Sequence, residues 1–197
     1  MSTGPLPRRQ TATQGGGTGA GRRSYGLEQI TEYLRGFEGG QVIDFGGACQ
    51  SNIDYVTGLG HRLYAEDVLV TLAGAAGAGT IPGDCFAFPR SSVHAVLCWD
   101  RLQFLSEPQL GAVLDRLHRV LAPGGLLLAI FHPEQAPTAA PLTCRVAGDG
   151  QLLVTAAAGA RPFRPFNTRA IERLFQNFES VKLYLTRDNL QEVIVRR

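Results

Sequence analysis

The chain has 197 residues, of which 44% are hydrophobic and 18% charged, and its formal net charge at pH 7 is +2. This length and balance are typical of one globular domain with a sizeable core. So small a net charge argues against nucleic acid or an anionic membrane as a partner bound through bulk charge. The four cysteines form no Cys-x-x-Cys pair and no two histidines have metal-ligand spacing, so we expect no metal site.

The first residues differ in composition from the rest. Residues 1–24 are rich in Gly, Thr, Arg and Pro and contain almost no large apolar side chains. Such a segment buries too little surface to offset the entropy of ordering, so we predict a disordered tail before a folded domain of residues 25–197. No apolar stretch follows the arginines of the tail, and the longest apolar run, Leu126–Phe131, is far shorter than the roughly 20 residues that span a bilayer. We therefore expect a cytoplasmic protein.

Helical and strand patterns alternate in the first half of the domain. The sequence predicts a helix over residues 27–37, a strand over 41–45, a helix over 51–59, a strand over 62–65, a short helix from 68 and a stunted third strand over 80–84. The first of these strands enters the glycine pair Gly46-Gly47, which ends the extended pattern.

The second half has the clearest pattern. Ser106 and Gln109 match a capping box ahead of a helix that reaches residue 121, and a Pro-Gly-Gly turn stops this helix. The strand that follows, Leu126–Phe131, is apolar on both faces, which is typical of the middle of a parallel sheet. The remaining pattern predicts a strand over 94–98 before the capping box, a hairpin of strands 143–146 and 151–155, a helix over 171–178, and antiparallel strands 181–185 and 192–195.

This order predicts an α/β fold: a doubly wound, mostly parallel seven-stranded sheet with a closing antiparallel hairpin and helices on both faces. In such a sheet the ligand lies beyond the carboxyl ends of the strands. The polar and aromatic residues at or just after strand ends are Asp44, Asp67, Asp84, Trp99, Asp100 and His132.

Two long segments carry a resemblance to a known family. Val42–Ala48 is an apolar strand that ends in an acid and a glycine-rich turn, and Val93–Phe131 combines a strand, a helix and a Pro-Gly-Gly turn. Both resemble class I (Rossmann-like) S-adenosylmethionine-dependent methyltransferases, and residues 165–197 resemble the closing helix and hairpin of bacterial members. The resemblance implies S-adenosylmethionine as cofactor, with Asp44, Phe45, Gly46 and Gly47 in the first motif, Asp67 at the ribose hydroxyls, Asp84 near the adenine amine, and Trp99 stacked on the adenine or at the pocket floor.

The glycine-rich turn departs from the family's Gly-x-Gly-x-Gly pattern. Ala48 and Gln50 stand at the second and third glycine positions, and His94 stands where the family often has Asp. Two functions therefore stay open. One is methyl transfer to a small-molecule or protein acceptor, which proximity and orientation can achieve without a dedicated catalytic side chain. The other is a catalytically inactive module of the same fold that acts in binding, as a scaffold or in regulation, with a protein as a possible partner. A nicotinamide dehydrogenase is a third alternative, which the glycine turn matches poorly.

Each candidate residue also has a purely structural interpretation. Asp44 could cap the turn that follows it, Asp67 could cap the next helix, and Trp99 could belong to the core. An open pocket beside Gly46 favours methyl transfer, whereas a Gln50 side chain that plugs this pocket favours the inactive module.

Overall fold

The protein is described by a computed structural model over residues 20–73, 82, 85–133 and 138–197. Its centre is a six-stranded sheet of order β10-β11-β5-β4-β2-β3. These strands are β2 (Gln41–Asp44), β3 (Arg62–Ala65), β4 (Val93–Trp99), β5 (Leu121–Phe131), β10 (Ser180–Leu185) and β11 (Gln191–Arg196). Strands β3, β2, β4 and β5 are parallel, and β11 is antiparallel to both β5 and β10, which confirms the predicted closing hairpin.

The prediction of seven strands is not confirmed, because the main sheet has six strands in the described part of the chain. The predicted third strand, residues 80–84, lies outside the described residues except for Pro82.

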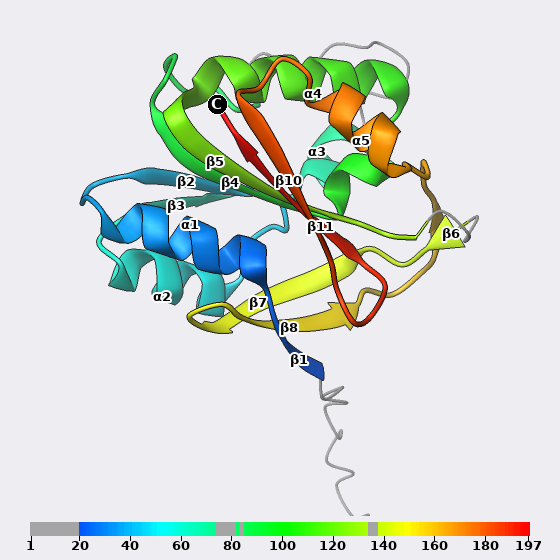
Figure 1. The fold of residues 1–197 in the computed structure, drawn as a ribbon, viewed down its shortest axis with the longest axis horizontal. Coiled ribbons are helices and arrows are strands. Elements are labelled where there is room, and N and C mark those ends of the chain that lie inside the picture. Colours follow the sequence, from blue (N-terminus) through cyan, green and yellow to red (C-terminus); the bar gives the residue numbers. More distant parts are fainter. Residues whose placement is uncertain (1–19, 74–81, 83–84, 134–137) are drawn as a thin grey trace, which may run out of the picture.

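Helices cover both faces of the sheet (Figure 1). On one face lie α1 (Tyr25–Arg35) and α2 (Gln50–Gly58), and on the other lie α3 (Val68–Ala73), α4 (Glu107–Val120) and α5 (Thr168–Leu174). The predicted capping box is present at the start of α4, where the Ser106 hydroxyl accepts from the Gln109 N–H and the Gln109 side chain accepts from the Ser106 N–H. Within the described ranges, no helix combines the length and hydropathy that crossing a membrane requires.

The core consists of two apolar clusters, one on each face of the sheet. Strand β5 contributes to both, since Leu127, Ala129 and Phe131 face α4 and α5 while alternate residues face α1. Every residue from Leu127 to Phe131 is at most 1% exposed, as expected for a central strand with helices on both sides.

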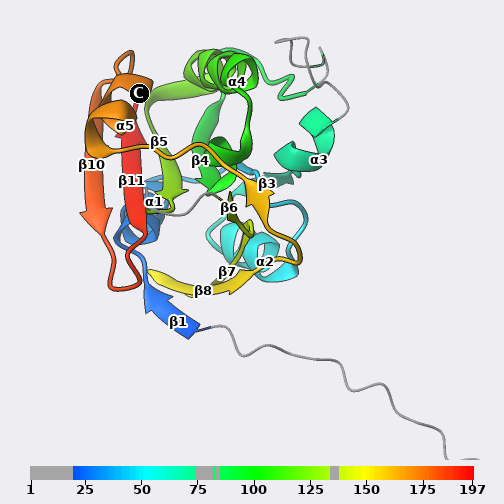
Figure 2. The same ribbon diagram turned by 90° about the vertical axis from the view of Figure 1, so that its right-hand side faces the viewer.

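A small sheet of order β1-β8-β7 lies beside α1 and α2, at the bottom of Figures 1 and 2. It consists of β1 (Ala20–Arg23), β8 (Gln151–Ala156) and β7 (Leu142–Gly148). The predicted disordered tail is therefore wrong for residues 20–24. Strand β1 pairs with β8, and Arg22 forms ion pairs with Asp188 and Glu192, so this end of the tail has tertiary partners that composition does not reveal. Residues 1–19 lie outside the described residues.

The strand order reverses between β2 and β4. From β2 the chain passes to β3 on one side and returns to β4 on the other. In open α/β sheets the carboxyl ends of such strands flank the ligand crevice. The turn after Asp44 and the segment that begins at Trp99 lie at this point, next to the short 3-10 helix η1 (Arg101–Phe104).

Two short strands, β6 (Thr138–Ala139) and β9 (Arg161–Pro162), pair with each other and complete the described elements.

Candidate functional site

The turn after β2 brings together the residues of the first predicted motif. Gly47 has a φ of +83°, a conformation that side-chain-bearing residues rarely adopt, so glycine is required there. Phe45 is fully buried and packs against Phe86 with ring centroids 4.9 Å apart. Phe45 therefore anchors the turn in the core.

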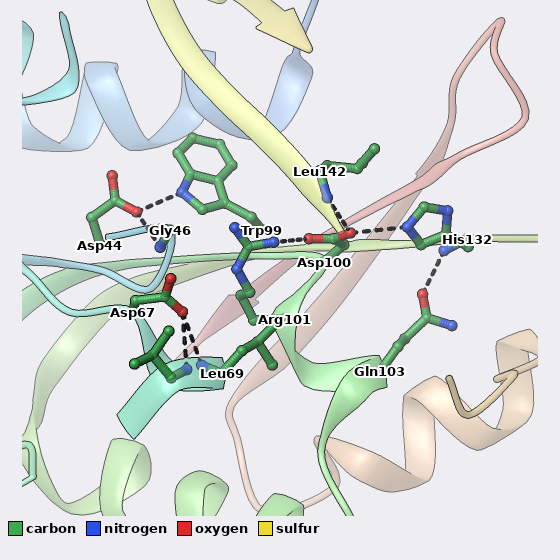
Figure 3. A network of polar contacts seen from close by, with 11 residues as sticks. Asp44, Gly46, Asp67, Leu69, Trp99, Asp100, Arg101, Gln103, His132 and Leu142 are labelled. Carbon is green, nitrogen blue, oxygen red and sulfur yellow. Dashed lines mark hydrogen bonds and ion pairs between the residues drawn. The ribbon is translucent and has the colours of Figure 1, made fainter. Parts of the chain in front are cut away.

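The carboxylate of Asp44 is enclosed in the protein and is 0% exposed. Its Oδ1 accepts hydrogen bonds from the Gly46 N–H at 2.8 Å and from the indole Nε1 of Trp99 at 2.6 Å, as Figure 3 shows. Its Oδ2 accepts from the Asn52 amide at 2.8 Å. Burial raises the pKa of Asp44, and the hydrogen bonds from Asn52, Gly46 and Trp99 oppose this shift. Asp44 thus holds the turn in its shape, as its structural interpretation predicts.

Trp99 covers one face of the glycine turn. It is the last residue of β4, is fully buried, and has a φ of +49°, which is strained backbone for an aromatic residue. A Cβ on Gly46 would lie only 3.1 Å from the indole ring. The chain's own side chain therefore packs against Gly46 on this face.

Asp67 lies on the other side of the turn, where a β-bridge joins it to Gly46. Its Oδ1 accepts from the N–H groups of Leu69 and Val70 at 3.1 and 3.2 Å, so Asp67 caps the first turn of α3. Its Oδ2 lies 3.8 Å from the position that a Cβ on Gly47 would occupy. Asp67 therefore caps a helix and also presents a carboxylate oxygen beside the turn.

Two other sequence candidates need separate mention. Asp84 lies outside the described residues. His94 lies at the amino end of β4, away from the turn, where its Nδ1 accepts from the Gln41 N–H at 3.2 Å and its ring packs against Phe37. His94 thus has a structural role at the amino end of β4, where it contacts the start of β2 and Phe37.

A cavity of about 390 Å³ runs along the turn and the start of α2. It is lined by residues 46–52 of the turn and helix and by residues 143–145 of β7. The exposed Gln50 side chain borders this cavity, and its amide donates to Asp54 at 2.7 Å, so Gln50 does not plug it. Cys49 is the N-cap residue of α2; its thiol lies 3.3 Å from the Ser51 hydroxyl and does not cap a backbone N–H of the first turn. The N–H groups of Asn52 and Ile53 donate to the Cys49 carbonyl, which leaves those of Gln50 and Ser51 to face an anionic group in the cavity.

A second polar network centres on Asp100, which is 0% exposed (Figure 3). Its Oδ1 accepts from Nη1 of Arg101 at 2.7 Å. Its Oδ2 accepts from the Leu142 N–H at 2.8 Å and lies 2.9 Å from Nε2 of His132. The backbone N–H of His132 donates to the side-chain oxygen of Gln103 at 2.6 Å. The sequence placed Asp100 and His132 after strand ends but gave no signal that they pair.

Among the described residues, no group of three or more His, Cys, Asp or Glu side chains is arranged to hold a metal ion. Burial raises the pKa of Cys98 and Cys144 well above the usual range, so these thiols act as packing residues.

No protein-family model and no curated protein matches this sequence. Solved structures match it in fold. A SAM-dependent methyltransferase from Archaeoglobus fulgidus superposes with a TM-score of 0.53 at 10% identity over 87% of this chain and 91% of that one. A putative type 11 methyltransferase from Sulfolobus solfataricus gives a TM-score of 0.50 at 16% identity over 86% and 90% of the two chains. A putative S-adenosylmethionine-dependent methyltransferase from Listeria monocytogenes gives 0.50 at 10% identity over 87% and 95%.

The chain therefore has the α/β fold of class I S-adenosylmethionine-dependent methyltransferases, as the sequence resemblance predicted.

Proposed function

We propose that this chain binds S-adenosylmethionine beside Gly46-Gly47 and transfers its methyl group to a small-molecule or protein acceptor. The observation that carries this proposal is the cavity of about 390 Å³ along the turn, which Gln50 leaves open. When bound, S-adenosylmethionine supplies an electrophilic methyl group on a positively charged sulfur.

The described residues suit this cofactor at two points. The N-terminus of α2 carries partial positive charge and borders the cavity, so it suits the carboxylate of the cofactor. The Oδ2 of Asp67 beside Gly47 suits a ribose hydroxyl. The side chains of Asp44, Phe45 and Trp99 are buried and are bonded to or packed against other residues of the chain. We therefore assign them the role of positioning the turn, without direct contact to the cofactor. A role for Asp84 at the adenine rests on the sequence resemblance alone.

One observation favours the second candidate function, a catalytically inactive module of the same fold that binds a partner. The indole ring of Trp99 packs against the Gly46 face and is hydrogen-bonded to Asp44. Glycine in such a turn commonly allows a ligand to lie close to the backbone. Here the indole ring of Trp99 lies close to the Gly46 backbone instead.

Titration calorimetry with S-adenosylmethionine and S-adenosylhomocysteine separates the two functions. Trp99 is the one tryptophan of the chain, so its fluorescence reports independently on events at the turn. We expect both ligands to bind the wild type and to change this fluorescence. Asp67→Ser retains a capping oxygen but removes the carboxylate, so it should weaken binding about tenfold or more, whereas Gln50→Ala should bind as the wild type does.

Three outcomes decide between the proposals. Binding by the wild type supports methyl transfer as far as the cofactor is concerned. Binding by Trp99→Ala alone supports the inactive module, because the indole would then be what excludes the cofactor. Absence of binding in both proteins would overturn the methyl-transfer proposal.

A further inference from the structure

A second and larger cavity, of about 900 Å³, lies between the β1–β8 pair and the turn that joins β10 to β11. Its volume falls within the roughly 300–1,000 Å³ that is usual for small-molecule sites. Apolar side chains line much of it, namely Tyr25, Leu142, Val154, Leu185 and Leu190. Tyr25 is 45% exposed and Leu185 is 73% exposed, and large apolar side chains gathered at an opening are typical of a binding surface.

His132 brings a proton acceptor to this cavity. With Nε2–H donating to the buried carboxylate of Asp100, the imidazole is held in the tautomer in which Nδ1 keeps its lone pair. Asp100 is itself fixed by Arg101 and by the Leu142 N–H. The rings of Phe104 and Phe163 pack around the imidazole, with centroids 6.1 and 5.6 Å away. An imidazole oriented by a buried carboxylate is the arrangement of a general base.

The charges that face His132 across the cavity nearly cancel. Arg22, Arg23, Arg187 and Asp188 line the walls. Arg22 is paired with Asp188 and with the buried Glu192, and Arg23 is paired with Glu28. The walls therefore offer little net charge, which favours a ligand with a mainly apolar body.

Arg22 adds a second recognition point. Its Nε is buried and has no hydrogen-bond partner among the described residues. Buried donors in folded proteins nearly always have a partner, so an orphaned donor beside a cavity suits a ligand with an acceptor group.

We propose that this cavity binds a small molecule with an apolar body and a weakly acidic hydroxyl, and that Nδ1 of His132 takes the hydroxyl proton. The O–H bond breaks with its electron pair left on oxygen, and the new N–H bond makes an imidazolium ion whose charge Asp100 balances. The proton later leaves to solvent through the open side of the cavity. Because the ionised oxygen is a nucleophile, we assign this ligand as the methyl acceptor. That assignment rests on the proposed function.

The two cavities share strand β7 as a wall. Leu142 lines the larger cavity, and Thr143–Arg145 line the one beside the glycine turn. Methyl transfer between them would need this wall to move, whereas binding and proton transfer in the larger cavity would not.

The test uses 4-nitrophenol as the probe, because its ionised form absorbs visible light and no methyl donor is needed. At a pH where the free phenol is mostly protonated, we expect wild-type protein to increase the phenolate absorbance saturably. His132→Gln should reduce this signal at least about tenfold, because the proton acceptor is gone. His118→Gln, on α4 and outside the cavity lining, is the matched control and should retain it.

Two further measurements do not depend on the folding of the His132 variant. Ala156→Phe adds bulk at an exposed lining position and should weaken probe binding. In NMR spectra of the four histidines, the probe should shift the imidazole signals of His132 and leave those of His118 unchanged.

A wild type without a saturable signal, a signal retained in folded His132→Gln, or one unaffected by Ala156→Phe would overturn the inference. None of these assays contains S-adenosylmethionine, so their outcome does not depend on whether the proposed function is correct. A probe signal in a protein that binds no cofactor would overturn the acceptor assignment and leave the hydroxyl-binding site intact.

Discussion

The indole Nε1 of Trp99 donates a 2.6 Å hydrogen bond to Asp44, and neither side chain is exposed to solvent. This contact ties the end of β4 to the end of β2 at the point where the strand order reverses. It also places the one tryptophan of the chain directly over the glycine turn.

Trp99→Phe should lower the free energy of unfolding by about 1–3 kcal/mol, because the buried Asp44 carboxylate loses one donor. Urea unfolding followed by far-UV circular dichroism measures this change. Tyr64→Phe, at a 38% exposed position on β3, is the control and should change stability by less than about 0.5 kcal/mol. A Trp99→Phe protein as stable as the wild type would show that the hydrogen bond contributes nothing.

The raised pKa of Asp44 predicts a pH-dependent stability difference between wild type and Asp44→Asn. Since burial raises the folded-state pKa above the unfolded value, the folded state binds the Asp44 proton more tightly. This contribution is fully present below the unfolded pKa and is lost as pH rises through the folded pKa. The stability of wild type minus that of Asp44→Asn should therefore fall from acidic to neutral pH in urea titrations. A difference that stays constant or rises would contradict the assigned shift.

Asn52 joins α2 to β2 and to β7 through three buried hydrogen bonds, one to β2 and two to β7. Its amide donates to Asp44 and to the Cys144 carbonyl at 3.1 Å, and its carbonyl accepts from the Val146 N–H at 2.8 Å. Asn52→Ala leaves these groups without partners and should cost about 3 kcal/mol of unfolding free energy.

Hydrogen exchange gives a local check on this prediction, because the Val146 amide should lose protection in the variant. Asn177→Ala, at an exposed position, is the matched control and should behave as the wild type does. Unchanged protection of Val146 would mean that β7 is held by other contacts.

The ion pair between Arg22 and Glu192 fixes β1 to the main sheet. Glu192 is 0% exposed, lies 2.9 Å from Nη2 of Arg22, and accepts from the Gly26 N–H at 3.0 Å. Arg22→Met leaves a buried carboxylate without its cation and should destabilise the protein by about 3–5 kcal/mol. The double variant with Glu192→Gln should recover part of this loss in thermal unfolding. Equal destabilisation in single and double variants would instead assign the loss to packing of the Arg22 stem.

Local sequence signals predicted most of the elements. The capping box at Ser106 and Gln109 lies at the start of α4, and the apolar run Leu126–Phe131 lies in the central strand β5. Both depend on neighbouring residues, so they can be recognised without tertiary structure. The seven-stranded sheet is not confirmed over the described residues, where the main sheet has six strands. The disordered tail is wrong for residues 20–24, since strand β1 depends on a partner more than 120 residues away.

The sequence by itself determined the alternation of helices and strands, the central place of β5, and the edge of the sheet at which polar residues gather, because periodicity and caps are local. The tertiary structure decided which of those residues meet. Trp99 binds Asp44 across 55 positions and His132 meets Asp100 across 32, whereas Gln50 turns to Asp54 and leaves the cavity open. Such pairings depend on how distant strand ends pack, and hydrogen bonds of about 3 Å require positions that only the folded chain sets.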